Sequence, residues 1–466
     1  MSCSRAAVLL LCAAVAAGVP APSAAQSQAD VPRITYRERT LPNGLRLYTI
    51  SDRTTPTVAV TAWYGFGTRD DPPGRSGMAH LVEHLMFQGS RNVKPNQMVE
   101  IAEDAGWPNF PGSQSTIEYD ALSVYQEVPS GSLERFLWAE GDRLRGLVIT
   151  DSLLNFEREA VAGEIRREVL DPPYGGLPVR LQRESFTRHP YRNLGSGNLD
   201  ELGRITLEEV RAFNARFSRP DNVVLIVVGN FDAAQLDRWV DRYFGSIPRP
   251  ATPLRRERVE EPARTAERRV TEYTRGRAPA VGISFPAPAW NSPDIAALRI
   301  ARQMLASPGS ARLTRLVQQQ RIATRVAVFL PPRQAPGLLT LEAYGTPETT
   351  AEQLEQAMRA EIARLRDEPV PEADLERIKN LLVTERLRQM ETHVDKATTL
   401  GLAITVQGDP EWANTWIAQL RAVTAADIQR VMRKYAADSN LVILHYLPES
   451  ARSAGQRPAG AERGNR

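Results

Sequence analysis

The sequence has 466 residues, of which 58 are Lys or Arg and 55 are Asp or Glu, so its formal net charge is +3. Such a small net charge gives no reason to expect a protein that binds nucleic acid or an anionic membrane surface. The length allows two or three domains, and the hydrophobic content of 42% is ordinary for a globular protein with its own core.

Residues 1–25 are typical of a secretory signal peptide. Arg5 precedes the apolar run AAVLLLCAAVAAGV, and small residues stand just before Gln26, where we expect cleavage. The run is short for a transmembrane helix, so we expect export without a stable membrane span, into the periplasm if the source is Gram-negative; an uncleaved anchor is the alternative. Both cysteines, Cys3 and Cys12, lie in this segment, which excludes disulfides and a cysteine nucleophile from the mature chain.

From Arg33 the hydrophobic pattern alternates as it does in strands. RITYRERTLPNGLRLYTISDRTTPTVAVTAWYGFG predicts two strands joined by the turn PNG, and then a third strand. ITLEEVRAFNARFSRPDNVVLIVVGNF, from Ile205, predicts a helix with Thr206 at its N-cap and Glu209 completing a capping box. A turn containing Asn222 and a β-branched strand then end this part of the chain.

The second part of the chain repeats this order. VTAADIQRVMRKYAADSNLVILHYLP begins at Val423, and its Thr424 and Asn440 correspond to Thr206 and Asn222 at one constant offset. Strands and helices are mixed without strict βαβ alternation. We therefore predict an α+β fold of two homologous halves, each a mainly antiparallel sheet packed against helices.

The boundaries of the halves follow from composition. Residues 33–250 form the first half, and residues 264–449 form the second. The Pro- and charge-rich stretch between them predicts a linker at residues 251–263. Residues 450–466 are polar and rich in Gly, Ala and Arg, so we expect a disordered tail.

A short apolar helix in the first half, SGMAHLVEHLMFQGS, carries three metal-competent side chains. His80 and His84 are four residues apart and lie on one helix face, with Glu83 beside that face. This H-x-x-E-H pattern is typical of hydrolytic zinc sites, with two imidazole ligands and a carboxylate that takes a proton from water. The alternative, two surface histidines and a solvated Glu, is disfavoured because the apolar neighbours indicate burial, which is costly for unpartnered polar groups.

A third protein ligand is expected for a catalytic zinc. The helix NFEREAVAGEIRREVLDPP offers Glu157 and Glu164, which are seven residues apart and share a face. Periodicity alone does not decide which of the two binds. The corresponding helix of the second half, AALRIARQML, has no His and no Glu, so we expect the chemistry in the first half alone.

HLVEH, followed after about eighty residues by EREAVAGE, then by HPYRNLGSG, FGSIP and GSARLTRLV, resembles the pitrilysin, insulin-degrading enzyme and mitochondrial processing peptidase family. The resemblance covers nearly all of the mature chain. It implies one Zn²⁺ per chain held by His80, His84 and Glu164, with Glu83 as general base. It implies that Glu157 orients a ligand or the water, and that substrates are peptides added as a strand to a sheet edge.

The sequence departs from the family pattern at a substrate-contact region. AGWPNFPGSQSTIEYD keeps Asn109, but Phe110 stands where the family has Ala. Asn109 is therefore a candidate for holding the substrate backbone. A turn-forming Asn is the alternative.

The second departure lies in LVQQQRIATRV. Gln318 and Thr324 stand near positions where active relatives carry an Arg and a Tyr that hold the substrate carbonyl, and they supply neither a cation nor a phenol. The nearby arginines, among which the pattern does not choose, are Arg312, Arg321 and Arg325. In the family this pair can come from a second chain, so we expect a dimer, specifically a heterodimer with a related chain that supplies the pair.

The sequence thus predicts a zinc metalloendopeptidase that acts on peptides or unfolded segments. The alternative from another class is a non-catalytic structural or assembly subunit of the same family. An esterase is disfavoured because no Gly-x-Ser-x-Gly segment is present. Of the other histidines, we interpret His189 as structural and His393 and His445 as incidental.

Overall fold

The computed structural model describes residues 31–95, 97–104, 114–193, 195–306 and 312–455. The expected signal peptide and Asn109 lie outside these residues. The described residues from Arg33 onward belong to one compact unit.

The first half forms a six-stranded sheet in the order β1-β2-β6-β3-β5-β4. Neighbouring strands are antiparallel except β2 and β6, which run parallel. The strands are β1 (Arg37–Thr40), β2 (Arg46–Ser51), β3 (Thr57–Tyr64), β4 (Gln114–Ile117), β5 (Leu122–Pro129) and β6 (Val223–Gly229). The expected PNG turn joins β1 to β2, and Gly44 takes a left-handed φ of 96° there.

The second half forms a five-stranded sheet in the order β7-β11-β8-β10-β9. Its strands are β7 (Arg268–Thr274), β8 (Ala280–Ala287), β9 (Ala323–Phe329), β10 (Gly337–Gly345) and β11 (Val442–Pro448). Only β7 and β11 are parallel within it. The order and directions repeat those of β2-β6-β3-β5-β4, which confirms the predicted α+β fold with two similar, mainly antiparallel halves.

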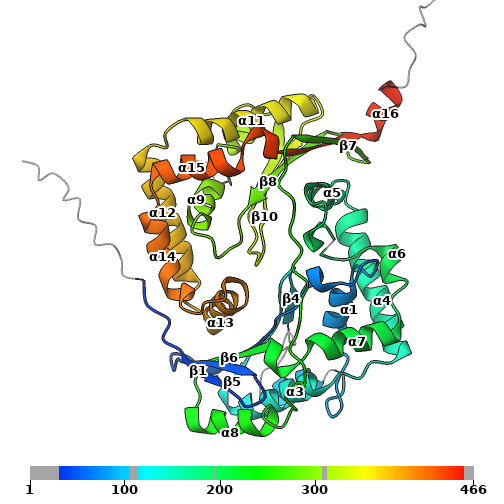
Figure 1. Cartoon of the computed structure of the whole chain (residues 1–466), viewed down its shortest axis with the longest axis vertical. Helices are drawn as coiled ribbons and strands as arrows, with labels where there is room; N and C mark the ends of the chain where they lie inside the picture. Colours follow the sequence, from blue (N-terminus) through cyan, green and yellow to red (C-terminus); the bar gives the residue numbers. More distant parts are fainter. Residues whose placement is uncertain (1–30, 96, 105–113, 194, 307–311, 456–466) are drawn as a thin grey trace, which may run out of the picture. The chain divides into compact units, whose positions relative to one another are not determined.

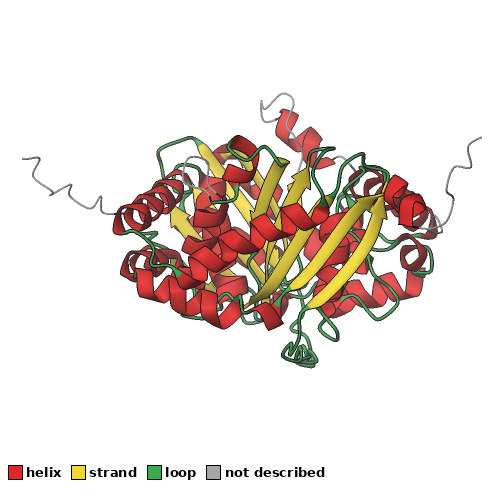
Figure 2. Ribbon diagram, turned by 90° about the horizontal axis from the view of Figure 1, so that it is seen from above, coloured by secondary structure: helices red, strands yellow, loops and turns green. Residues whose placement is uncertain are grey.

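Helices cover the faces of both sheets (Figure 2). Those of the first half are α1 (Met78–Leu85), α2 (Gln97–Asp104), α3 (Leu133–Arg145), α4 (Asp151–Ile165), α5 (Gly176–Ser185), α6 (Leu199–Leu202), α7 (Leu207–Phe217) and α8 (Ala233–Tyr243). Those of the second are α9 (Ile295–Ala306), α10 (Thr314–Gln318), α11 (Ala351–Asp367), α12 (Glu372–Arg388), α13 (His393–Leu402), α14 (Trp412–Ala422), α15 (Ala425–Tyr435) and α16 (Glu449–Gly455). One apolar core lies between the first sheet and α1, α3, α4, α7 and α8.

The two halves exchange one helix each (Figure 1). Helix α5, from the first half, packs on β8 and β11 of the second sheet, where Leu177 and Leu181 join Val442 and Leu444 in one apolar cluster. Helix α13, from the second half, packs on β3 and β6 of the first sheet. Each half therefore completes the core of the other.

The docking of α13 depends on Gly401. A Cβ at this position would lie 2.1 Å from Cε2 of Trp63 on β3. We expect Gly401→Ala to lower the free energy of unfolding by about 2–4 kcal/mol, because the overlap forces the helix and strand apart. Urea denaturation measures the loss. Gly131→Ala, where a Cβ meets nothing within 4 Å, is the control and should change it by less than about 0.5 kcal/mol.

A buried carboxylate joins α9 to α15. Asp294 accepts hydrogen bonds from Arg430 (2.6 Å), Lys434 (2.9 Å) and the Tyr435 hydroxyl (2.8 Å). Burial raises the pKa of Asp294, but these hydrogen bonds outweigh it and hold the pKa at about 2. The ion pairs therefore stabilise the folded chain above the carboxyl's ordinary pKa of 3.8 and lose their effect as the pH falls toward 2.

We expect Asp294→Asn to lower the free energy of unfolding by roughly 1–2 kcal/mol at pH 7. The deficit should shrink as the pH falls below about 4. Chemical denaturation at pH 7 and pH 3 measures both values. Glu348→Gln, at an exposed carboxylate, is the control; an equal deficit at both pH values would contradict the assignment.

The prediction of a disordered tail at residues 450–466 was wrong for residues 450–455. Residues 449–455 form α16, which packs against β7 and β11. The Arg452 guanidinium lies 4.3 Å from the centre of the Tyr273 ring, a contact that a composition-based prediction does not reveal.

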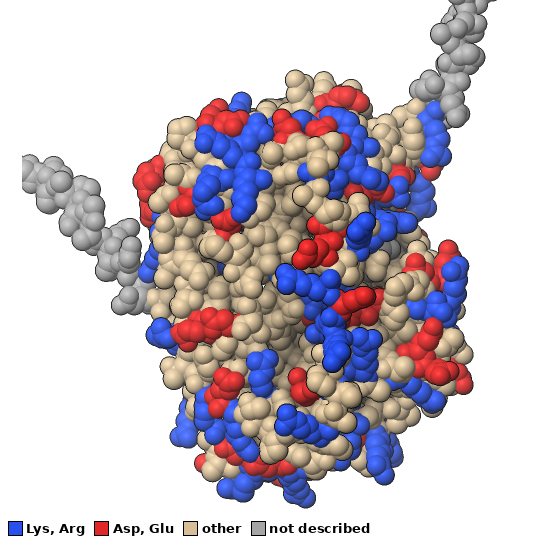
Figure 3. Space-filling view, in the orientation of Figure 1, with Lys and Arg blue, Asp and Glu red and all other residues tan. Residues whose placement is uncertain are grey.

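Acidic and basic side chains are mixed over the face in Figure 3, as the small net charge leads one to expect. Within the described ranges, no helix combines the length and apolarity needed to span a bilayer.

Candidate metal centre

Helix α1 is anchored in the core by one face. Met78, Leu81, Val82 and Leu85 are fully buried there. The helix begins after Gly77, whose φ of 100° is left-handed. The first amides of the helix are held by Asp71, whose carboxylate accepts from the Gly77 and Ala79 N–H groups at 2.8 Å each. Burial raises the pKa of Asp71 to about 8, against the effect of these two hydrogen bonds.

The remaining face of α1 meets α4 at a group of three possible ligands. Oε2 of Glu164 lies 3.3 Å from Nε2 of His80 and 3.5 Å from Nε2 of His84. One ligand atom from each of the three residues lies within 4.8 Å of the others. In the part of the chain that the structure describes, no other set of three His, Cys, Asp or Glu residues is so arranged.

The distances fit a zinc ion. Zinc takes nitrogen and oxygen ligands at about 2.0–2.2 Å in a tetrahedron, whose edges are then roughly 3.4 Å long. The two distances from Glu164 to the histidines match that edge. Two imidazoles and one carboxylate leave a fourth position open, as in catalytic zinc sites.

Hydrogen bonds behind the rings orient both histidines. Nδ1 of His80 lies 3.0 Å from the Ser196 carbonyl oxygen, which can only accept, so this nitrogen carries the proton. Nδ1 of His84 lies 2.8 Å from Oε2 of Glu157, whose other oxygen accepts from the Gln88 amide. In the neutral form of each ring, the lone pair of Nε2 therefore points toward Glu164, and such outer partners strengthen metal binding.

The Ser196 carbonyl is itself positioned by two glycines in contact. Gly197 has a φ of 102°, and a Cβ there would lie 2.8 Å from the Cα of Gly77. Only glycine allows this approach, which brings the loop close to the start of α1. Ser196, Gln88 and Asp71 were missed by the sequence analysis, although the glycines of HPYRNLGSG were a possible signal.

Glu83 lies beside the three ligands and next to the edge of the first sheet. Glu83 is only 6% exposed, and burial raises the pKa of its carboxyl group. A hydrogen bond with Ser115 and the proximity of His80 oppose this rise, whereas Glu164 adds to it. Ser115 belongs to β4, the edge strand that packs against α1.

The structure separates the two glutamates that periodicity left equivalent. Glu164 faces the Nε2 atoms of both histidines, whereas Glu157, only 4% exposed, contacts the opposite side of the His84 ring. This placement agrees with the one that the resemblance implies.

The other sequence candidates lie elsewhere. Gln318 ends α10, and the hydroxyl of Thr324 on β9 donates to the Tyr344 carbonyl. Among the arginines near them, Arg321 has a left-handed φ of 56°, and Arg325 lies over the Tyr344 ring. The remaining histidines have partners of their own: His189 accepts from the Tyr191 N–H, His445 contacts Glu355, and His393 is buried beside Thr57.

Two models of one protein family match this chain. The model described as insulinase (peptidase family M16) matches residues 46–172, which include His80, Glu83, His84, Glu157 and Glu164. The model described as the peptidase M16 inactive domain matches residues 204–382, which begin near the end of the first half and extend through much of the second.

Individual relatives match over most of the chain. Zinc protease PqqE of Helicobacter pylori is 24% identical, over 88% of this chain and 92% of its own. A probable mitochondrial-processing peptidase subunit beta of Arabidopsis thaliana is 24% identical, over 87% of this chain and 77% of its own. Among solved structures, a protease from Helicobacter pylori superposes with a TM-score of 0.84 at 23% identity, over 89% of this chain and 99% of that one.

Proposed function

Because the chain belongs to the M16 family of peptidases, we propose that it is a zinc metalloendopeptidase that hydrolyses peptide bonds in peptides or unfolded segments. The observation that carries this proposal is the convergence of His80, His84 and Glu164, with Glu83 beside them. A site that only stabilised the fold would have four protein ligands.

The residues have distinct roles in the proposed reaction. His80, His84 and Glu164 would hold the zinc, which when bound would polarise the scissile carbonyl and lower the pKa of the attacking water. Glu83 takes the proton of that water and delivers it to the leaving amine. Glu157 fixes the orientation of the His84 ring through Nδ1.

The peptide substrate is proposed to add to the edge strand β4. Among the described residues, this strand has a hydrogen-bonded neighbour on one side only, and its Ser115 contacts Glu83. An extended peptide paired with β4 would thus bring a backbone carbonyl next to the general base.

A non-catalytic subunit of the family is the second candidate. The match of residues 204–382 to an inactive-domain model and the presence of Gln318 and Thr324 favour it. The complete set of His80, Glu83, His84 and Glu164 favours catalysis. A dimer explains both sets of residues, specifically a heterodimer in which a related chain donates the Arg and Tyr. From the expected signal peptide we propose that the protein is exported, into the periplasm if the source is Gram-negative.

The test is cleavage of a quenched fluorescent peptide library by the purified chain loaded with one equivalent of zinc. We expect cleavage, with or without a co-expressed Arg- and Tyr-bearing relative, loss of cleavage with a chelator, and recovery on adding zinc back. A zinc-loaded chain that cleaves no peptide under either condition would contradict the proposal and favour the non-catalytic subunit.

A further inference from the structure

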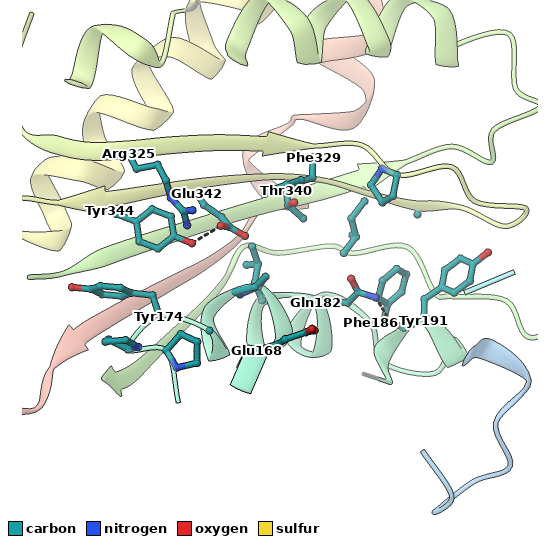
Figure 4. Close-up of a pocket in the computed structure, with 18 of the residues that line it drawn as sticks. Glu168, Tyr174, Gln182, Phe186, Tyr191, Arg325, Phe329, Thr340, Glu342 and Tyr344 are labelled. Carbon is teal, nitrogen blue, oxygen red and sulfur yellow. Dashed lines mark hydrogen bonds between the residues drawn. The ribbon is translucent and has the colours of Figure 1, made fainter. Parts of the chain in front are cut away.

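A cavity of ≈ 780 Å³ lies against the second sheet, and none of the three candidate ligands lines it. Its floor is formed by β9 and β10, and its opposite wall is formed by residues between Glu168 and Tyr191 of the first half (Figure 4). This volume is in the range of pockets that enclose small ligands or side chains.

The cavity exists because the exchanged helix covers only part of the sheet. Helix α5 packs mainly on β8 and β11 and leaves much of β9 and β10 open. Alternate residues of β10 line the cavity: Leu338, Thr340, Glu342 and Tyr344. The residues between them, Leu339, Leu341 and Ala343, are fully buried.

One end of the cavity is polar. Glu342, in the middle of β10, is only 3% exposed, and burial raises the pKa of its carboxyl group. Among the described residues, the only hydrogen bond to this side chain comes from the Tyr344 hydroxyl, at 2.6 Å, and no cation lies within ion-pair distance. A carboxylate so buried normally has further partners, and the second oxygen of Glu342 can accept another hydrogen bond.

A cation is nevertheless close to this end. The guanidinium of Arg325 lies 4.1 Å from the centre of the Tyr344 ring, on the strand position paired with Tyr344. Its charge favours the ionised form of Glu342 and would repel a basic group entering beside it. The vacant acceptor therefore suits a neutral donor better than a lysine or arginine.

Most of the remaining lining is apolar or aromatic, although Glu168, Gln182 and Arg333 also border the cavity. Phe186, Tyr191, Leu181 and Leu338 line it, and Phe329 lies at its border with 48% of its surface exposed. Such walls fit a flat ring better than a flexible aliphatic chain. An aromatic ring with a hydrogen-bond donor at its tip satisfies both the walls and Glu342.

The cavity lies close to the metal centre along the chain. Helix α4 continues after Ile165 as a π-helical turn, Arg166–Leu170, and Glu168 of this turn lines the cavity. Glu168 is four residues beyond Glu164, or about 6 Å along a helix axis. A peptide residue a few positions from the scissile bond can span such a distance, at about 3.3 Å per residue.

We propose that this cavity is the pocket that selects a tyrosine or tryptophan side chain of the substrate, with the phenol O–H or indole N–H donating to Glu342. The proposal rests on the peptidase function proposed above and names its substrate class: peptides with a tyrosine or tryptophan near the cleaved bond. A phenylalanine would leave the buried acceptor unpaired, and a site built to bind such a donor discriminates strongly against the analogue that lacks it.

The test uses blocked amino acids as probes, so that it needs neither catalysis nor a partner chain. N-acetyl tyrosinamide and tryptophanamide should bind at least about tenfold more tightly than the phenylalanine and lysine amides, as measured by NMR titration. Glu342→Leu should abolish the preference for tyrosine over phenylalanine, and Glu342→Gln should retain part of it. Leu338→Trp should fill the pocket and prevent binding, whereas Leu381→Trp, at an exposed leucine of α12, should not.

Cleavage of a peptide series with Tyr, Trp, Phe or Lys at each position near the scissile bond is the second measurement. Three results would overturn the pocket assignment. They are tighter binding of the lysine probe than of the tyrosine probe, equal binding of the tyrosine and phenylalanine probes, and undiminished probe binding by Leu338→Trp. Peptide cleavage without aromatic preference would overturn it while leaving the peptidase function intact. Glu342-dependent probe binding with no cleavage of any peptide would instead contradict the peptidase function.

Discussion

Replacing Glu83 by Gln is expected to lower kcat for peptide hydrolysis by about 10²–10⁴-fold, the usual contribution of a general base. The amide has nearly the same shape as the carboxylate but cannot take a proton from water. Zinc content should remain at one per chain, because Glu83 is not one of the three residues whose ligand atoms converge. Single-turnover cleavage of a fluorescent peptide and elemental analysis of the same sample measure the two quantities.

Glu159→Gln is the matched control for this variant. Glu159 lies on α4 near the centre, but its side chain is exposed, so its loss should leave both rate and zinc content unchanged. If Glu83→Gln retains zinc and cleaves at the wild-type rate, another group is the base. A loss of zinc together with activity would instead place Glu83 among the ligands.

The two glutamates of α4 should differ in their effects on metal affinity. Glu164→Gln removes the only anionic ligand of the proposed set, so we expect the zinc dissociation constant to rise by more than about a hundredfold. Glu157→Gln keeps an acceptor for His84 but loses its charge, and the expected rise is about 10–100-fold, as for other partners behind a ligand. Competition against a chromophoric chelator measures both constants.

Glu159→Gln again serves as the control, since it changes the same helix without touching either histidine. The order of the two effects is what matters. A larger loss of zinc affinity in Glu157→Gln than in Glu164→Gln would mean that Glu157 is the ligand.

The core of the candidate site could be predicted because it is local. His80 and His84 are separated by one helical turn, so their shared face follows from helix geometry alone. The choice between Glu157 and Glu164 could not be made in this way, because both occupy one face of α4. Which glutamate faces the histidines depends on the position along α4 at which α1 packs, and this position is set by tertiary packing.

The hydrogen bond behind His80 was beyond prediction for the same reason. Ser196 contributes a backbone carbonyl, which has no signature in the sequence, and it reaches His80 only through the contact of Gly77 with Gly197. Glu342 was also overlooked, because a single Glu in an alternating strand is normally read as facing solvent. Its burial depends on where α5 stops covering the sheet.

The fold class was predictable because the alternation of strands and the Thr-capped helices repeat along the chain. The destinations of α5 and α13 were not. Each is amphipathic and follows elements of its own half, so nothing in either segment indicates that its apolar face packs on the other sheet.

This exchange of α5 and α13 constrains how the protein reaches its native state. During synthesis, all strands of the first sheet are complete by Gly229, but the helix that covers one face of that sheet begins only at His393. In the growing chain, an apolar face of the first sheet therefore stays exposed until most of the second half has been synthesised. The two halves therefore cannot complete their folding one after the other. Contacts between segments so distant in sequence form late, which favours slow, concerted folding.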